Sequence, residues 1–166
     1  MMLYVNGSSH VAAAEAVNQF SFAYQDADLV HLGHLPHPSN LSVSWGKLLS
    51  VILRSGFYCG AIENNTNNKI IKDTEDWLNQ NQNQNKLIII QWCDFVDEFK
   101  EHKDIYKFHQ RLKKKKIKHV FLNSAVCFSN RIKSYDWGYY YIEPYNSSMT
   151  YCNLFKSNKI ETVTPN

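Results

Sequence analysis

The residue best placed for covalent chemistry in this sequence is a serine close to the N-terminus. Ser9 ends the run Gly7-Ser8-Ser9, which follows an apolar segment at residues 3–5 and precedes a helix-forming segment at residues 11–17. At a turn between a strand and a helix, a serine oxygen projects outward while nearby backbone N–H groups point at a developing anion. The position predicts a nucleophile, although the same pattern also occurs in turns that have no chemical role.

Three longer runs of the sequence resemble one hydrolase superfamily. They are Tyr4–Asn18, Pro36–Leu49 and Asn67–Ile71. Together they resemble the phage-encoded branch of the SGNH/GDSL hydrolases. The resemblance implies a serine ester hydrolase of bacteriophage origin in which Ser9 is the nucleophile and Ser8 replaces the usual aspartate or cysteine.

The resemblance also implies an oxyanion hole that is built from two later blocks of the family's sequence. The glycine of the second block falls near Asn64, whose backbone N–H is one candidate donor, and the side chain of Asn67 is another. In the third block, Cys93 occupies the position where asparagine is typical, and Asp94 follows it. Cys93 and Asp94 are therefore predicted to lie at the rim of the site.

The general base of the family has no counterpart at the expected place in this sequence. The family carries a D-x-x-H segment near the C-terminus, whereas no histidine follows His119 in this chain. His10 is the first alternative base because it follows the serine directly. His34 and His37 lie in a loop predicted at residues 20–40, which could fold over the rim as a lid. Since a serine hydroxyl needs an adjacent base, we expect a truncated or inactive relative.

No metal or cofactor is expected. His31 and the two loop histidines have a spacing that suggests zinc, but no predicted element aligns them. His102 and His109 belong to a predicted helix, where we expect them to be structural or solvated. The four cysteines form no C-x-x-C pair, so neither a zinc ribbon nor a disulfide framework is predicted. A reducing location fits best: the cytoplasm, that of the host cell if the protein is phage-encoded, with the virion as an alternative.

Hydrophobic periodicity predicts the elements that position these residues. Strands are expected at residues 3–5, 57–62, 87–92 and 120–123, and helices at residues 11–17, 45–53 and 70–78 and in a long segment after Asp94. Asp94 could cap that last helix, with Val96 and Phe99 among its packing residues.

The alternation of strands and helices predicts an α/β fold, a three-layer sandwich with a mostly parallel, flavodoxin-like sheet in a single domain over residues 1–166. Ligands of such sheets bind outside the carboxyl ends of the strands. Residues 7–10, 63–68, 91–94 and 123–127 should therefore meet at one rim.

Composition limits the partners. The longest apolar run, residues 87–90, is far shorter than the roughly 18 residues of a spanning helix, so no membrane partner is expected. The basic run at residues 111–118 is predicted to be a solvated helix end, which makes nucleic acid an unlikely partner. The aromatic segment at residues 135–142 is expected to be core.

A small ester or carbohydrate is the expected ligand. The alternatives are a non-catalytic phage protein that binds a carbohydrate, an acyl group or a protein, and, more weakly, a nucleic-acid-associated protein.

Overall fold

The computed structural model describes residues 1–8, 11, 44–62, 64–132 and 134–157. Its sheet has four strands, all parallel, in the order β2-β1-β3-β4. The strands are β1 (Met2–Asn6), β2 (Gly56–Cys59), β3 (Lys86–Trp92) and β4 (Lys118–Asn123). The helices are α3 (Trp45–Ile52), α4 (Asn67–Gln80), α5 (Glu98–Lys114) and α6 (Tyr151–Ser157), and a short 3-10 helix, η3, spans Ser147–Met149.

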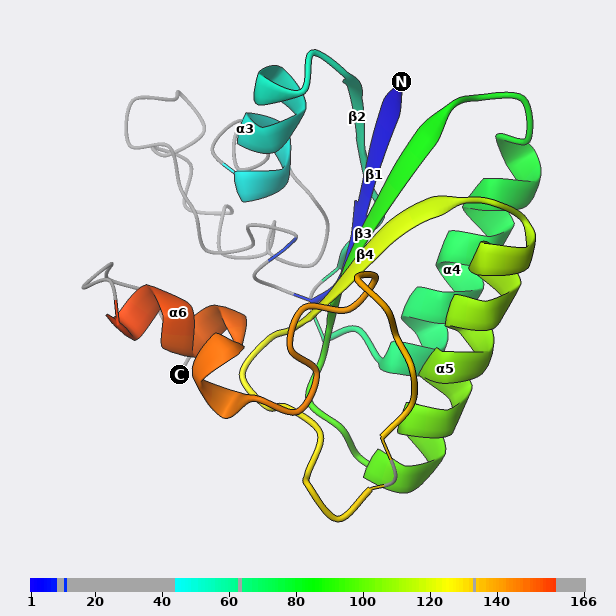
Figure 1. Cartoon of the computed structure of the whole chain (residues 1–166). Coiled ribbons are helices and arrows are strands. Elements are labelled where there is room, and N and C mark those ends of the chain that lie inside the picture. The colour runs from blue at the N-terminus through cyan, green and yellow to red at the C-terminus, as the bar shows by residue number, and fades with distance from the viewer. Residues whose placement is uncertain (9–10, 12–43, 63, 133, 158–166) are drawn as a thin grey trace.

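Helices lie on both sides of the sheet, which confirms the α/β prediction. Helices α4 and α5 lie side by side on one side, and α3 lies on the other (Figure 1). The expected helix at residues 11–17 lies outside the described residues apart from Val11, and the expected loop at residues 20–40 lies outside them entirely.

Strand β3 is an inner strand, as its continuous apolar run predicts, because it pairs with β1 on one side and β4 on the other. Its side chains alternate between two apolar clusters. Ile88 and Ile90 join the cluster that includes α4 and α5, whereas Ile89 joins Leu3 and Val5 on the opposite face. The sheet is therefore packed on both faces.

Helix α4 begins where a threonine caps it. The Thr66 side chain accepts the N–H of Lys69 at 3.3 Å. Hydrophobic spacing predicts an inward face of Ile70, Ile71, Thr74, Trp77 and Leu78, and all of these residues except the half-buried Ile71 are buried.

Helix α5 begins later than the sequence predicts. Its cap is Asp97, whose side chain accepts the N–H of Lys100 at 3.1 Å, and not Asp94, which is exposed. The inward face starts one turn into the helix, so Val96 is 96% exposed and Phe99 67% exposed. The prediction that these two residues pack in the core was wrong.

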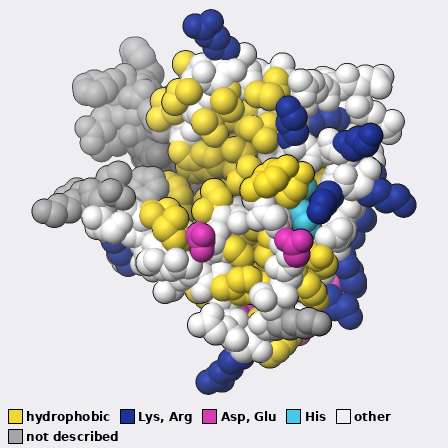
Figure 2. Space-filling view, viewed as in Figure 1, with side chains coloured by type: hydrophobic (Ala, Val, Ile, Leu, Met, Phe, Trp, Pro, Cys, Tyr) yellow, Lys and Arg dark blue, Asp and Glu magenta, His cyan; other side chains and the backbone are white. Residues whose placement is uncertain are grey.

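Hydrophobic spacing predicts that an apolar stripe of Trp45, Leu48, Leu49, Ile52 and Leu53 faces the sheet, but helix α3 packs differently. Its buried residues are the small Gly46 and Ser50. A Cβ added at Gly46 would lie 3.1 Å from the side chains of Val5 and Phe57, so the helix backbone lies close to the sheet. This close approach turns much of the predicted apolar stripe outward. Leu48, Val51, Ile52 and Leu53 are exposed, and Figure 2 shows apolar side chains gathered over this part of the molecule.

The aromatic segment after β4 closes the edge of the sheet. Phe121 in β4 donates its N–H to the carbonyl of Tyr140 and accepts the N–H of Ile142. Trp137 and Tyr141 are buried, in agreement with the predicted core role, whereas Tyr139 is 85% exposed. Within the described residues, no helix has the length and apolar character needed to span a bilayer.

Candidate active site

Three segments that are distant in sequence meet at the carboxyl edge of the sheet. Asn65 donates from its Nδ2 to the carbonyl oxygen of Gly7 at 3.1 Å. The Ser8 side chain hydrogen bonds to the Cys93 thiol, and Asn67 contacts the Cys93 backbone. The turn after β1, the turn before α4 and the end of β3 therefore form one rim, as the topology predicts for a parallel sheet.

The fourth predicted segment joins this rim through backbone contacts. Ser124, directly after β4, donates its N–H to the carbonyl of Trp92 at 3.2 Å and accepts the N–H of Cys152 at 3.2 Å. Through the second contact, the first turn of α6 is held against the end of β4.

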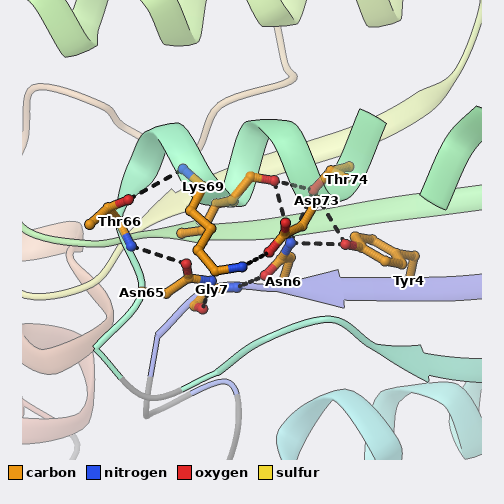
Figure 3. A network of polar contacts seen from close by, with 9 residues as sticks. Tyr4, Asn6, Gly7, Asn65, Thr66, Lys69, Asp73 and Thr74 are labelled. Carbon is orange, nitrogen blue, oxygen red and sulfur yellow. Dashed lines mark hydrogen bonds and ion pairs between the residues drawn. The ribbon is translucent and has the colours of Figure 1, made fainter. Parts of the chain in front are cut away.

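A buried polar network fixes the end of β1 (Figure 3). The Asn6 side chain is fully buried, and its Nδ2 lies 2.8 Å from the hydroxyl of Tyr4 and 3.1 Å from Oγ1 of Thr74. Its Oδ1 accepts the N–H of Gly7 at 2.8 Å. Burial raises the pKa of Tyr4, so the phenol stays neutral. The network sets the direction in which the chain leaves the strand.

Gly7 is required by the close approach of a neighbouring backbone. A Cβ at this position would lie 2.8 Å from the carbonyl oxygen of Gln91 and 2.5 Å from Cγ2 of Val11. A side chain would therefore push the turn after β1 away from β3.

Both the oxygen and the nitrogen of the Asn67 side chain form hydrogen bonds within the protein. Its Oδ1 accepts the N–H of Cys93 at 2.8 Å, and its Nδ2 lies 3.3 Å from the Cys93 carbonyl oxygen and 2.5 Å from Oε2 of Glu101. An amide nitrogen carries two hydrogens, and both are directed at these acceptors. In this conformation Asn67 positions the rim and offers no free N–H to an oxyanion.

Asn64 also lies at this rim, but unlike the buried Asn67 it is exposed. Its φ of 51° lies in the left-handed region that glycine adopts most readily. Asparagine tolerates this conformation better than most residues.

Cys93 and Asp94 lie at the end of β3. Burial, together with the charges of Asp94 and Glu101, raises the pKa of the Cys93 thiol to about 11. Cys93 is therefore a neutral thiol near pH 7 and a poor nucleophile.

The described histidines are not available as bases. His102 is buried, and its Nε2 lies 3.0 Å from the hydroxyl of Tyr145. That hydroxyl oxygen also accepts the backbone N–H of Tyr135 and the indole N–H of Trp137, each at 3.0 Å, so its own proton goes to His102. Burial lowers the pKa of His102, which favours the neutral ring.

His109 and His119 form a second buried histidine site. Nδ1 of His109 lies 2.8 Å from Nε2 of His119, and Nδ1 of His119 lies 2.8 Å from the carbonyl oxygen of Ile117. His119 is thus a donor to the carbonyl and an acceptor from His109. Both rings are buried and structural, which for His109 is one of the two roles that the sequence predicts.

The remaining predicted site residues, Ser9, His10, His34 and His37, lie outside the described residues. Within the part of the chain that the structure describes, no group of three or more histidine, cysteine or acidic side chains is arranged to hold a metal ion.

Sequence reasoning missed two residues that build this rim. Asn65 is buried and holds the carbonyl of Gly7, and Glu101 is buried and receives Asn67. Glu101 also accepts the backbone N–H groups of Val96 and Asp97. In a sequence, a glutamate four residues after a helix cap indicates only that it accepts backbone N–H groups at that helix start. Its contact with Asn67 of α4 could not be predicted.

Comparison with protein-family models and with curated proteins finds no match to this chain.

Proposed function

We propose that this protein is a slow serine ester hydrolase of the SGNH/GDSL type, in which Ser9 attacks the ester carbonyl. The observation that carries the proposal is the anchoring of the turn before Ser9. Asn65 holds the Gly7 carbonyl, and Ser8 hydrogen bonds to Cys93, so two neighbouring segments fix the chain just ahead of the serine. A nucleophile needs such positioning by rigid elements.

The conformation of Asn64 supports the same proposal. Asn64 stands where the resemblance puts the glycine of the family's second block, and it has a glycine-like φ of 51°. Its backbone N–H is the proposed first oxyanion donor from this block. Asn67, the proposed side-chain donor, would have to release the Cys93 carbonyl or Glu101 to act.

The base is proposed to be His10, with His34 and His37 as alternatives. None of the three histidines His102, His109 and His119 can replace them, because all three rings are buried and each is held in place by Tyr145, by the other histidine of the pair or by a backbone carbonyl. Without a well-placed base, a serine is a weak nucleophile, so turnover should fall below the ordinary enzymic range of about 1–10³ s⁻¹. The proposed place of action is the cytoplasm, that of the host cell if the gene is carried by a phage.

Labelling with a fluorophosphonate probe tests the proposal. The wild-type protein should become labelled, and the Ser9→Ala variant should not. Ser8→Ala is the matched control, because it removes the neighbouring hydroxyl and should keep labelling. Absence of labelling in folded wild-type protein, or labelling that persists in Ser9→Ala, would refute a nucleophilic Ser9.

A non-catalytic carbohydrate-binding role is the second candidate, and a hollow in the aromatic segment favours it. The hollow has a volume of about 310 Å³ and is lined by Tyr135, Asp136, Trp137, Gly138, Tyr141, Glu143, Pro144 and Tyr145. Aromatic rings beside two carboxylates suit a sugar, whose apolar face packs on rings while its hydroxyls donate to carboxylates.

Tryptophan fluorescence titration with chitotriose and maltotriose tests this second role. Saturable quenching that Glu143→Gln weakens and Glu75→Gln leaves unchanged would support it. Unchanged fluorescence with both sugars up to 10 mM, about ten times the upper end of the usual range of Michaelis constants, would count against it.

A further inference from the structure

A pocket at the opposite end of the sheet combines lysines with side-chain amides. It has a volume of about 600 Å³, within the usual range for small-molecule sites. It lies between the end of α4 and the start of β3 on one side and the turn from α5 to β4 on the other. Its lining residues are Leu78, Asn79, Gln82, Gln84, Asn85, Lys86, Lys115, Lys116, Ile117 and Lys118.

The charge of this pocket is of one sign. Four of its ten lining residues are lysines, and none is an aspartate or a glutamate. Figure 2 shows further lysine and arginine side chains along the side of the molecule where α4 and α5 lie. An anion is therefore the chemistry that the lining favours.

One of the four lysines has a structural role. The Lys86 ammonium group donates to the carbonyl oxygens of Asn81 and Gln82, just past the end of α4. These contacts satisfy carbonyls that the helix end leaves free. Burial lowers the pKa of Lys86. Lys86 thus supports the wall of the pocket and is the least available of the four to a ligand.

The other three lysines are uncommitted. In the described part of the chain, the ammonium groups of Lys115, Lys116 and Lys118 have no hydrogen bond or ion pair, and all three residues are exposed. By contrast, Arg111 in the last turn of α5 pairs with Glu75 at 2.7 Å. Among the described residues, the three exposed lysines that line the pocket therefore form no ion pair with a carboxylate of the protein.

Helix dipoles do not account for all of this charge. Helices α4 and α5 both end beside the pocket, at Gln80 and Lys114, and each C-terminus carries the equivalent of about −0.5 charge. Two ends amount to about −1, against four lysines. A surplus of about three positive charges remains for a ligand.

We infer that this pocket binds a small phosphorylated molecule with two or more phosphate groups, a nucleotide being the form that fits the lining best. Lys115, Lys116 and Lys118 contact the phosphates as point charges. The half-buried Ile117, with the edge of the buried Leu78 beside it in the lining, offers an apolar surface to the flat base. The side-chain amides offer both donors and acceptors to the edge of the base.

This site is separate from the proposed esterase site. Lys86 and Trp92 stand at opposite ends of the seven-residue strand β3, and the six steps of about 3.3 Å between them put them roughly 20 Å apart. The inference does not rest on Ser9, and a failure of one proposal leaves the other unaffected.

Isothermal titration calorimetry tests the inference. The full chain is titrated at low salt with inorganic triphosphate, with ATP and with a short DNA duplex. The pocket variant replaces Lys115, Lys116 and Lys118 by alanine. The control variant replaces Lys100, Lys103 and Lys107 by alanine, which removes the same charge from exposed positions on the first turns of α5. Circular dichroism confirms that both variants fold.

The expected result is one site per chain for ATP and for triphosphate, with ATP binding more tightly. The pocket variant should raise Kd at least tenfold, and the control variant less than threefold. If only the duplex binds and only the pocket variant loses it, the site takes phosphates from a nucleic-acid backbone, and the small-molecule inference is overturned. Equal losses in both variants, or no binding of triphosphate and ATP at 1 mM, would also overturn it, because attraction by net charge alone depends little on which lysines are removed.

Discussion

The side chain of Asn67 and the backbone of Cys93 hydrogen bond in both directions. Oδ1 of Asn67 accepts the Cys93 N–H at 2.8 Å, and Nδ2 lies 3.3 Å from the Cys93 carbonyl oxygen. Cys93 follows the last residue of β3, where the ladder with β4 ends. One side chain from the first turn of α4 thus satisfies two backbone groups that the sheet no longer pairs.

This relationship makes Asn67 a stability determinant. In Asn67→Asp, the donor to Cys93 and Glu101 becomes an acceptor, and a second carboxylate comes within reach of Glu101. The free energy of unfolding, measured by urea denaturation, should fall by about 2–4 kcal/mol. Asn68→Asp is the control, because residue 68 is exposed on the same helix turn and a carboxylate there is favourable. Equal stabilities of the two variants would contradict the role given to Asn67.

Gly7 provides a second stability test. Gly7→Ala places a Cβ 2.8 Å from the carbonyl oxygen of Gln91, and the backbone of β3 has little freedom to move. We expect a loss of about 1–3 kcal/mol in the free energy of unfolding, the usual cost of overpacking. Gly56→Ala is the matched control. Its Cβ meets the flexible end of Met2 at 2.9 Å, and a loss there as large as that at Gly7 would show that the backbone contact is not decisive.

Much of the fold could be predicted because its signals are local. The continuous apolar run of β3 and the helical spacing of Ile70, Thr74 and Trp77 are patterns that each segment carries by itself. The parallel topology followed from alternation, and the rim followed from the topology.

The contacts that build the site were less accessible to sequence reasoning. Asn6 and Thr74 are 68 residues apart and meet only after α4 packs on the sheet. Nothing in the asparagine-rich segment distinguishes buried Asn65 from exposed Asn64, since the difference arises from the left-handed turn at residue 64. The outward turn of Leu48 on α3 likewise depends on the close packing of Gly46.

The backbone conformation of Asn64 yields a third prediction. At a φ of 51°, a Cβ carries a steric cost that glycine avoids, and asparagine bears it better than alanine. Asn64→Ala should therefore be less stable than Asn64→Gly by about 1–2 kcal/mol in thermal or urea denaturation. If the rim is an oxyanion hole with a glycine-type donor, Asn64→Gly should also keep fluorophosphonate labelling at the wild-type rate. An alanine variant at least as stable as the glycine variant would contradict the left-handed turn.

The buried histidine pair predicts a loss of stability in acid. Burial, assisted by the neighbouring charges of His119 and Lys113, lowers the pKa of His109 to about 4, from an ordinary value near 6.5. Between these two values the unfolded chain binds the proton and the folded protein does not, so stability rises with pH. The stability that the neutral, buried His109 contributes is complete above pH 6.5 and is lost as the pH falls toward 4. Lowering the pH from 7 to 4.5 should cost about 2–3 kcal/mol from this group alone.

His109→Asn separates this effect from the titration of other groups. An asparagine amide can place an N–H near the position of Nδ1, and so keep a donor for Nε2 of His119, yet it does not titrate. The variant should lose stability at pH 7, because the smaller side chain leaves space beside Trp137 and Tyr140, whose rings lie 5.6 and 5.3 Å from that of His109. Its stability difference from wild type should then shrink by about 2–3 kcal/mol between pH 7 and pH 4.5 in urea denaturation. A difference that stays constant over this range would mean that His109 is protonated to the same extent in the folded and unfolded states, and that its burial beside His119 does not govern the response to acid.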